Sequence, residues 1–324
     1  MTTASKPTAL ILLNMGGPDS LDNIKPFLYN LFSDRELIQL PAGALLQKPF
    51  ARLISHFRSK KVRESYAYIG GRSPLLEWTN KQAQGIAQQL GPQLVPFVVM
   101  RYWHPFASEV LREIKQQKIE QAIVLSMYPH YAGATSGSSL NDFKRQAARL
   151  YPELKFQLIE HWFNWPGYIN ALANRVREGL ESFHELMRDD VRILFSAHAL
   201  PQKFIDRGDP YQQQVETTVH EVMQLVGDYR WSIAYQSRSG PVKWMTPGTD
   251  DEIIRYGAAG DKALLMVPVS FVSDHIETLE EIDLQYRLLA EQQGISNFQR
   301  APSLNDHEDF LAAMADLVRA RCSW

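Results

Sequence analysis

Short apolar runs, each followed by a turn and then by a stretch of helical period, limit most strongly what this chain can fold into. Seven such runs lie at residues 9–13, 94–100, 122–127, 156–159, 191–195, 231–235 and 263–269. Helical periodicity lies between them, as in ASEVLREIKQQ at 107–117. Apolar strands that alternate with helices are typical of parallel sheets whose faces are covered by helices. The sequence therefore predicts an α/β protein with one mostly parallel sheet or two.

Length, charge and cysteine content narrow the class of protein. With 324 residues, the chain is long enough for one large domain or two modest ones. A net charge of −2 argues against a nucleic-acid-binding protein. Because Cys322 is the only cysteine, an internal disulfide and a metal site with several thiolates are excluded for this chain. No stretch resembles a signal peptide or the roughly 18 apolar residues of a membrane span, so we expect a cytoplasmic protein.

Unusual segments follow the predicted strands, where a parallel sheet gathers its functional residues. They are NMGGP (14–18), RYWHP (101–105), YPHYAGATSGSS (128–139), SAHALP (196–201), QSRSGPVKW (236–244) and SFVSDHIETLEEID (270–283). Taken alone, NMGGP could be a tight turn that requires glycine dihedral angles. It lacks the third glycine of a G-x-G-x-x-G motif, so it is a poor dinucleotide-binding fingerprint.

His198 is a candidate general base, because imidazole is the side chain whose ordinary pKa lies nearest to cellular pH. It leaves the end of a predicted strand and enters a loop that contains a proline. The alternative is a structural histidine that hydrogen-bonds its own loop.

The acidic stretch 274–283 also has two interpretations. Asp274 and Glu277 have the spacing of a helix capping box, and acids in a first helical turn complement the helix dipole. However, Glu277 and Glu281 are four residues apart on one predicted helical face, where like charges repel each other. A bound cation would relieve that repulsion, so the stretch is also a candidate cation site.

Taken together and in this order, these segments resemble the ferrochelatase family, which inserts ferrous iron into a porphyrin to make haem. The matching blocks are LNMGGP (13–18), GGRSPL (70–75), RYWHP (101–105), FSAHALP (195–201), YQSRSGP (235–241) and FVSDHIETLEEID (271–283). The resemblance runs from Leu13 to about Leu317, which is nearly the whole chain.

This resemblance implies two similar Rossmann-like domains, each with a parallel sheet flanked by helices, and an active site in the cleft between them. We expect the first domain to span residues 1–125 and to be completed by a C-terminal helix at 302–324. The second domain, at 126–301, would carry the residues for metal insertion.

The resemblance also implies roles for the polar residues of the second domain. His198 would be a base and a metal ligand, and Glu277 would be a metal ligand or a proton acceptor facing His198 across the porphyrin. Asp274 and His275 would lie close by as supporting residues. Glu281 would continue a line of carboxylates along which a metal ion or protons could pass.

Porphyrin contacts are expected from Met15, Arg101 and Tyr102, and from the hydroxyl groups of Ser136 and Ser138 in the segment GATSGSS. A guanidinium can pair with a propionate, and hydroxyl and backbone N–H groups bind carboxylates. The alternatives are a surface arginine beside packed aromatic rings for RYWHP, and an ordinary polar loop for GATSGSS. Residues 236–238 could serve a propionate as well.

The segment 27–61 combines apolar and basic side chains. The residues concerned are Leu31, Phe32, Leu37, Ile38, Leu40, Arg52, Arg58, Lys60 and Lys61. This pattern predicts an amphipathic pair of helices packed on the core. In the family, the matching segment forms an apolar lip that touches the membrane, which implies a peripheral contact with the inner face of the membrane here.

The implied reaction joins Fe²⁺ and protoporphyrin IX into protohaem and releases two protons. No cofactor beyond the substrate iron is expected, and a single thiol cannot hold an iron–sulfur cluster. A coproporphyrin chelatase, a chelatase for cobalt or for another tetrapyrrole, and a non-catalytic haem or metal carrier remain alternatives.

Overall fold

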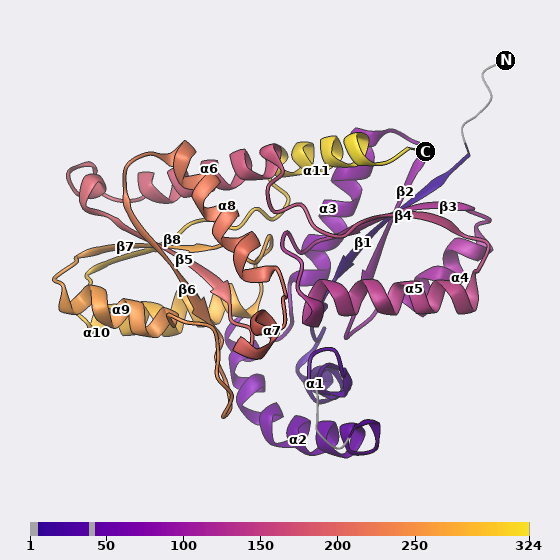
Figure 1. Ribbon diagram of the computed structural model, residues 1–324, viewed down its shortest axis with the longest axis horizontal. Helices are drawn as coiled ribbons and strands as arrows, with labels where there is room; N and C mark the ends of the chain where they lie inside the picture. The colour runs from indigo at the N-terminus through magenta and orange to yellow at the C-terminus, as the bar shows by residue number, and fades with distance from the viewer. Residues whose placement is uncertain (1–5, 39–42, 324) are drawn as a thin grey trace. The chain divides into compact units, whose positions relative to one another are not determined.

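The computed structural model describes residues 6–38 and 43–323 and divides the chain into two compact units (Figure 1). The first comprises residues 1–161 and 306–324, and the second comprises residues 162–305. The boundary predicted after residue 125 must be corrected, because β4 (Lys155–Ile159) pairs with β3 (Gln121–Ser126) in a single sheet. The first unit does include the C-terminal helix, as expected, although its chain resumes at residue 306.

Four parallel strands form the sheet of the first unit, in the order β2-β1-β3-β4. Strand β1 (Thr8–Asn14) lies between β2 (Leu94–Met100) and β3, so Ile11 has Phe97 on one side and Val124 on the other. Every residue of β1 is buried. An unbroken apolar run is what a strand covered on both faces requires, and it is the pattern that the sequence shows.

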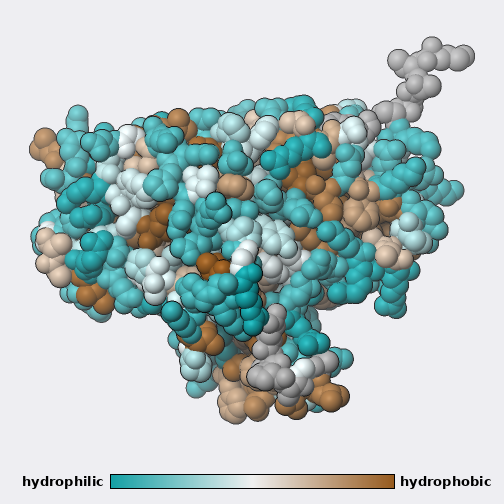
Figure 2. All heavy atoms as spheres, viewed as in Figure 1, coloured by the Kyte–Doolittle hydropathy of each residue, from teal (hydrophilic) through white to brown (hydrophobic). Residues whose placement is uncertain are grey.

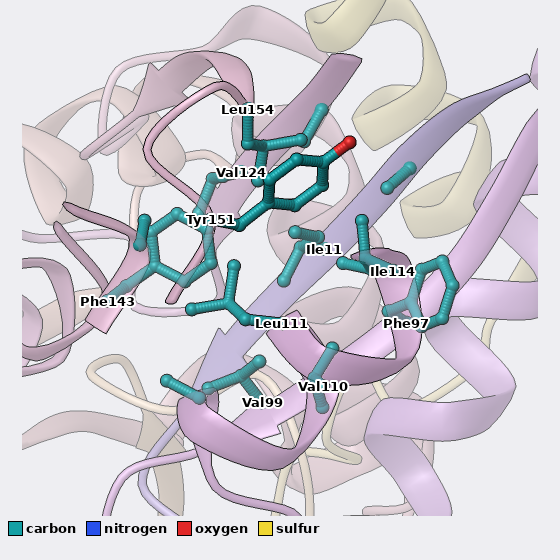
Figure 3. Close-up of a cluster of buried hydrophobic side chains, with 14 of the residues drawn as sticks. Ile11, Phe97, Val99, Val110, Leu111, Ile114, Val124, Phe143, Tyr151 and Leu154 are labelled. Carbon is teal, nitrogen blue, oxygen red and sulfur yellow. The ribbon is translucent and has the colours of Figure 1, made fainter. Parts of the chain in front are cut away.

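Helices complete the first unit. They are η1 (Leu21–Asn23), α1 (Ile24–Ser33), α2 (Ala44–Tyr68), α3 (Leu75–Leu90), α4 (Ala107–Gln116), η2 (Gly133–Gly137), α5 (Ser138–Leu150) and α11 (Glu308–Arg321). Figure 3 shows side chains of α4 and α5 packed against the sheet, with Leu111 and Phe143 beside Val124. Helix α11 packs on α3, where a Cβ on Gly85 would lie 2.5 Å from a Leu311 methyl group. Glycine at this position therefore allows the two helices to approach closely.

The predicted amphipathic helix pair at 27–61 is confirmed as α1 and α2, which pack against each other. Its apolar residues are placed differently from the expectation. Phe32 is buried and Leu31 is half-buried, whereas Leu45, Leu53 and Phe57 of α2 are exposed. Leu37 and Ile38 are also half-buried, and Leu40 lies outside the described residues.

The second unit has a parallel sheet of the same design, in the order β6-β5-β7-β8. Its strands are β5 (Arg192–His198), β6 (Arg230–Gln236), β7 (Ala263–Pro268) and β8 (Asn297–Arg300). Its helices are α6 (Pro166–Glu181), η3 (Glu185–Asp190), α7 (Gln202–Asp206), α8 (Tyr211–Val226), α9 (Thr249–Ala258), η4 (Glu277–Tyr286) and α10 (Arg287–Gln292). Figure 1 shows α6 and α8 on one face of this sheet and α9 and α10 on the other.

The predicted fold class is confirmed, because each unit has a four-stranded parallel sheet flanked by helices and both sheets have the same strand order. All seven predicted strands are present. The eighth, β8, is not predicted, since its sequence NFQR contains a single apolar residue. In both units the polar segments of interest follow the ends of the first three strands.

Candidate active site

His198 is the last residue of β5 and lies next to Glu277, the first residue of η4. Its Nδ1 atom is 2.8 Å from Glu277 Oε2. The side chains keep 33% and 19% of their surface exposed, so a substrate can still reach them. The structure brings together the two residues for which a joint role is predicted. The expectation that they face each other across the porphyrin is wrong, because a 2.8 Å contact leaves no space for a macrocycle between them.

The main chain of His198 is fixed by two neighbouring hydroxyl groups. Its N–H donates to Ser270 Oγ at 3.1 Å, and its carbonyl accepts a 2.9 Å hydrogen bond from the Tyr211 hydroxyl. Tyr211 and Ser270 also hydrogen-bond each other at 2.6 Å. The main chain of His198 is thus fixed at the strand end. Its ring bonds Glu277, which is distant in sequence, and this contact contradicts the alternative of a structural histidine that hydrogen-bonds its own loop.

Charge governs the protonation of this pair. Burial opposes the charged imidazole, but the charge and hydrogen bond of Glu277 raise the pKa of His198 above its ordinary value. Burial likewise opposes ionisation of Glu277, but the charge and hydrogen bond of His198 lower the pKa of that carboxyl. The two shifts favour an ion pair of imidazolium and carboxylate.

A second carboxylate, that of Glu281, lies on the same helix. It accepts hydrogen bonds from the Ser237 N–H at 2.9 Å, the Tyr286 hydroxyl at 3.1 Å and Gln236 Nε2 at 3.2 Å. Burial first, and then the charge of Glu277, raise the pKa of Glu281. The site therefore places two acids beside one imidazole, an excess of negative charge that suits a cation.

The helix that carries both acids is a π-helix over its whole length from Glu277 to Tyr286. The sequence predicted ordinary helical period here and missed this form. π-helical turns are rare and are frequent at functional sites.

Asp274 does not cap this helix, so the capping-box interpretation is wrong. Its carboxylate instead accepts hydrogen bonds from Arg300 at 3.0 Å, Ser303 at 2.7 Å and Asn305 at 2.9 Å. Arg300 also donates to Asp283 at 2.9 Å. Burial opposes ionisation of Asp274, but the charge of Arg300 and these hydrogen bonds lower its pKa. Asp274 thereby ties the end of β8 to the segment that precedes Glu277.

His275 lies between Asp274 and the π-helix and is buried. Its Nδ1 atom is 3.1 Å from the carbonyl oxygen of Ser273, and its ring is 4.3 Å from the ring of Phe271. Burial lowers the pKa of His275, which favours a neutral imidazole.

In the first unit, Arg101, Tyr102 and Ser138 meet at Asp34, a residue that the sequence analysis did not select. Arg101 Nη2 lies 3.0 Å from Asp34 Oδ2, and the Tyr102 hydroxyl donates to the same oxygen at 2.7 Å. Ser138 donates to Asp34 as well and accepts from Arg101 Nε at 2.7 Å. The cluster is closed, with 17% of the Arg101 side chain and 5% of the Asp34 side chain exposed.

Ser136 and Ser138 belong to the start of a helix rather than to a polar loop, because GATSG forms the π-helix η2 and continues into α5. Both side chains are fully buried. Ser136 Oγ hydrogen-bonds the N–H and the carbonyl of Ala132 at 2.9 and 3.2 Å. The polar-loop interpretation is therefore wrong.

Met15 follows β1 and is half-buried. Its N–H donates to Asn14 Oδ1 at 2.8 Å, and its carbonyl accepts from the N–H of Tyr102 at 3.0 Å. Gly16 has a φ of +81°, and a Cβ there would lie 2.9 Å from Met100 Cβ. The glycine dihedral angle expected in NMGGP is present at Gly16, but residues 15–18 form no turn. The backbone of Met15 is held by Asn14 and Tyr102 instead.

Comparison with known proteins identifies the family. The family model described as Ferrochelatase matches residues 7–322. The chain belongs to the ferrochelatase family. A ferrochelatase from Geobacter metallireducens is 49% identical over 316 residues, which cover 97% of this chain and 98% of that protein. A ferrochelatase from Synechocystis is 44% identical over 95% of this chain and 81% of that protein.

A solved structure of SirB from Bacillus subtilis with Fe³⁺ has a TM-score of 0.57 against this ferrochelatase family member. It covers 98% of this chain and 96% of its own, at 11% sequence identity. At that identity the similarity shows the chelatase fold alone. Among the residues that the structure describes, no three His, Cys, Asp or Glu side chains are grouped as a metal site.

Proposed function

We propose that this protein inserts Fe²⁺ into protoporphyrin IX, which loses two pyrrole protons as protohaem forms. The observation that supports this reaction best is the partly exposed pair His198–Glu277, with Glu281 linked to it through Ser237. The reaction requires a base for the pyrrole protons and an oxygen or nitrogen ligand for the arriving iron. The pair offers both.

In this proposal, Glu277 receives the iron and His198 receives a proton. Nδ1 of His198 faces Glu277, so Nε2 is the nitrogen left for the porphyrin. The raised pKa of His198 favours the protonated ring before iron arrives. A divalent cation on Glu277 lowers the pKa of the adjacent imidazole. His198 then releases its Nε2 proton to solvent, which its partly exposed ring can reach, and accepts a proton from a pyrrole N–H.

Glu281 would serve as the next acceptor along the helix. Its raised pKa suits a carboxyl that takes up a proton and later releases it to solvent. Asp274 and His275 would act as supporting residues, because Asp274 is tied to Arg300 and His275 is packed against Phe271.

The porphyrin would contact the first unit through Met15 and Arg101. Arg101 retains 17% exposure, so a propionate could share its guanidinium with Asp34. Tyr102, Ser136 and Ser138 are buried. We propose that Tyr102 and Ser138 hold the backbone of Met15 and the guanidinium of Arg101 in place, whereas Ser136 holds the start of η2 through Ala132.

Met15 also suggests which porphyrin is preferred. Protoporphyrin presents two vinyl groups where coproporphyrin presents two further propionates. A flexible apolar side chain packs well on a vinyl group, whereas a carboxylate buried against it without a cationic partner costs several kcal/mol. We therefore propose that protoporphyrin is the substrate and protohaem is the final product.

The decisive experiment is anaerobic insertion with protoporphyrin and coproporphyrin side by side, using ferrous, zinc and cobalt ions. Protoporphyrin with Fe²⁺ should have the higher kcat/KM, and Met15→Tyr should shift the ratio towards coproporphyrin. Equal or better insertion into coproporphyrin would contradict the preference. Porphyrin binding without insertion of any metal would identify a carrier instead of an enzyme.

No iron–sulfur cluster is proposed for this protein. Such clusters require several thiolates, and the sequence contains one cysteine, Cys322. The purified protein should lack the visible absorption of a cluster. An iron–sulfur electron-resonance signal in stoichiometric amount would contradict this expectation.

The proposed location is the cytoplasm, with peripheral contact at the inner face of the membrane through α2. Leu45, Leu53 and Phe57 are 87%, 59% and 69% exposed, and spacings of four or eight residues place them along one side of the helix. Figure 2 shows apolar surface where Figure 1 labels α2. Exposed basic residues, Arg52 and Lys60 among them, lie on the same helix. Among the described residues, no helix is long and apolar enough to cross a membrane.

Sedimentation with vesicles that contain anionic lipid tests this contact. Leu53→Ser combined with Phe57→Ser should weaken binding, because apolar area and basic charge both contribute to it. Leu186→Ser is the matched control, since Leu186 is 86% exposed but lies on the second unit. Equal loss in the control, or no binding by the unmodified protein, would overturn the proposal.

A further inference from the structure

Ser237, the first residue after β6, has an unusual backbone conformation. Its φ is +63°, in the left-handed region that residues with a Cβ rarely adopt. Glycine adopts this conformation without strain, whereas serine does not. Strained residues of this kind are concentrated at functional sites, where the surrounding structure holds them.

The left-handed turn lets Ser237 contact both acids of the active site. Its N–H lies 2.9 Å from Glu281 Oε1, and its Oγ lies 2.5 Å from Glu281 Oε2. The same Oγ is 3.0 Å from Glu277 Oε2. Ser237 therefore holds Glu281 by both of its oxygens and links it to the carboxylate that faces His198.

Neighbouring residues support this bridge. Gln236 Nε2 donates to Glu281 Oε2 at 3.2 Å, and the side-chain oxygen Oε1 of Gln236 accepts from Ser196 Oγ at 2.6 Å. Ser196 in turn hydrogen-bonds Thr249 at 2.9 Å. Gln236, Ser196 and Thr249 are all buried. The buried side chains of Gln236, Ser196 and Thr249 thus fix the end of β6 next to Glu281. Ser237, the following residue, also contacts Glu277.

We propose that Ser237 is a positioning residue for metal insertion, whose hydroxyl group keeps the carboxylates of Glu277 and Glu281 together in the orientation that receives the metal ion. This inference rests on the proposed function. Two carboxylates in a partly buried site repel each other. The Ser237 hydroxyl group donates its one hydrogen to one of them and accepts from the other when that carboxyl group is protonated, so it opposes their separation. The strain of the left-handed turn is retained because it brings the hydroxyl group to this place.

Three substitutions separate the hydroxyl group from the backbone strain. Ser237→Gly removes the hydroxyl group and relieves the strain, so its Tm should equal or exceed that of the unmodified protein. Ser237→Ala removes the hydroxyl group and keeps the strain. Ser237→Thr keeps the hydroxyl group on a stiffer, β-branched side chain, so its Tm should fall. Activity should depend on whether the hydroxyl group is present, whereas Tm should depend on how well the residue tolerates the positive φ.

The expected kinetic effect is a loss of about 10- to 100-fold in kcat/KM for Fe²⁺ in Ser237→Gly and Ser237→Ala, the usual cost of losing a partner of a metal ligand. The KM for protoporphyrin should stay unchanged, and Ser237→Thr should recover most of the activity. Lys118→Gly is the matched control, because Lys118 is exposed and also has a positive φ of 57°. That change should raise Tm without altering insertion.

The outcomes decide between this inference and its alternatives. If Ser237→Gly has the same kcat/KM for Fe²⁺ as the unmodified protein, the positioning role is overturned, whereas the proposed function is unaffected. A rise in the KM for protoporphyrin alone would overturn it in favour of a propionate contact. Absence of iron insertion by the unmodified protein would overturn the proposed function, and this inference with it.

Discussion

The two units place a polar cluster at equivalent points of equivalent sheets, yet the clusters differ in charge balance. Arg101 follows β2 and Ser237 follows β6, which are the matching edge strands. Ser138 and Glu277 lie on helical segments that follow β3 and β7, and each segment includes a π-helix. Each unit therefore places polar side chains at the same position relative to its own sheet.

In the first unit, one arginine balances one buried aspartate. Burial opposes ionisation of Asp34, but hydrogen bonds from Ser138 and Tyr102 and the charge of Arg101 lower its pKa. In the second unit, Glu277 and Glu281 share one imidazole, and the pKa of Glu281 is raised. A closed and balanced cluster stabilises the turns around it, whereas an open cluster with surplus negative charge is suited to receive a cation.

The largest expected effect follows from removing the imidazole or the facing carboxylate. His198→Ala and Glu277→Gln should each reduce kcat for iron insertion by about 10²- to 10⁴-fold, the usual contribution of a general acid or base. Porphyrin binding, measured by fluorescence quenching, should persist. Glu280→Gln is the control, because within residues 6–38 and 43–323 the Glu280 carboxylate accepts only from Gln285. If His198→Ala or Glu277→Gln retains nearly the activity of the unmodified protein, the second cluster has no catalytic role that sets it apart from the cluster at Asp34.

Breaking the balanced cluster should affect stability. Asp34→Ala leaves the guanidinium of Arg101 without its carboxylate in a mostly buried position. Loss of one partner of a buried ion pair costs about 3–5 kcal/mol of unfolding free energy. Urea unfolding measures this change. Glu36→Ala, two residues away, should stay within about 0.5 kcal/mol, and an equal loss in both variants would show that the cluster is not the cause.

The smallest effect is a pH dependence of opposite sign in the two clusters. Since the folded pKa of Asp34 is lowered, its contribution to stability is present above the ordinary value of 3.8 and is lost as pH falls through the folded pKa. Glu281 has a raised pKa, so the folded state becomes less stable as pH rises above the ordinary value of 4.5. Glu281→Gln should therefore stabilise the protein at neutral pH, and the gain should vanish below pH 4.5. A stabilisation that is independent of pH would contradict this assignment.

Much of the fold follows from local sequence. A strand buried on both faces needs an unbroken apolar run, and all seven runs form strands. The sequence does not predict strand β8, because an edge strand of four residues needs only one apolar residue, Phe298, in the core. The domain boundary was misplaced because nothing in KFQLI shows that β4 pairs back to β3 rather than starting a new sheet.

The candidate site was predicted less evenly. His198 and Glu277 lie in segments that resemble the ferrochelatase family, so the sequence predicts their importance. It does not predict that they contact each other directly. Asp34 gave no signal, since it meets Arg101 across 67 positions of the chain and a lone aspartate after a helix is ordinary. The π-helical form of η4 was also missed, because its first residues match an ordinary capping pattern.

The short strand β8 has a mechanical consequence for the active site. Arg300, its last residue, binds Asp274 before the π-helix and Asp283 within it, and so it clamps the segment on both sides of Glu277. Edge elements with few buried residues exchange their amide hydrogens early, through local opening. Fraying of β8 would release both points of the clamp at once. The protein should thus be inactivated by heat at a lower temperature than the one at which its cores melt.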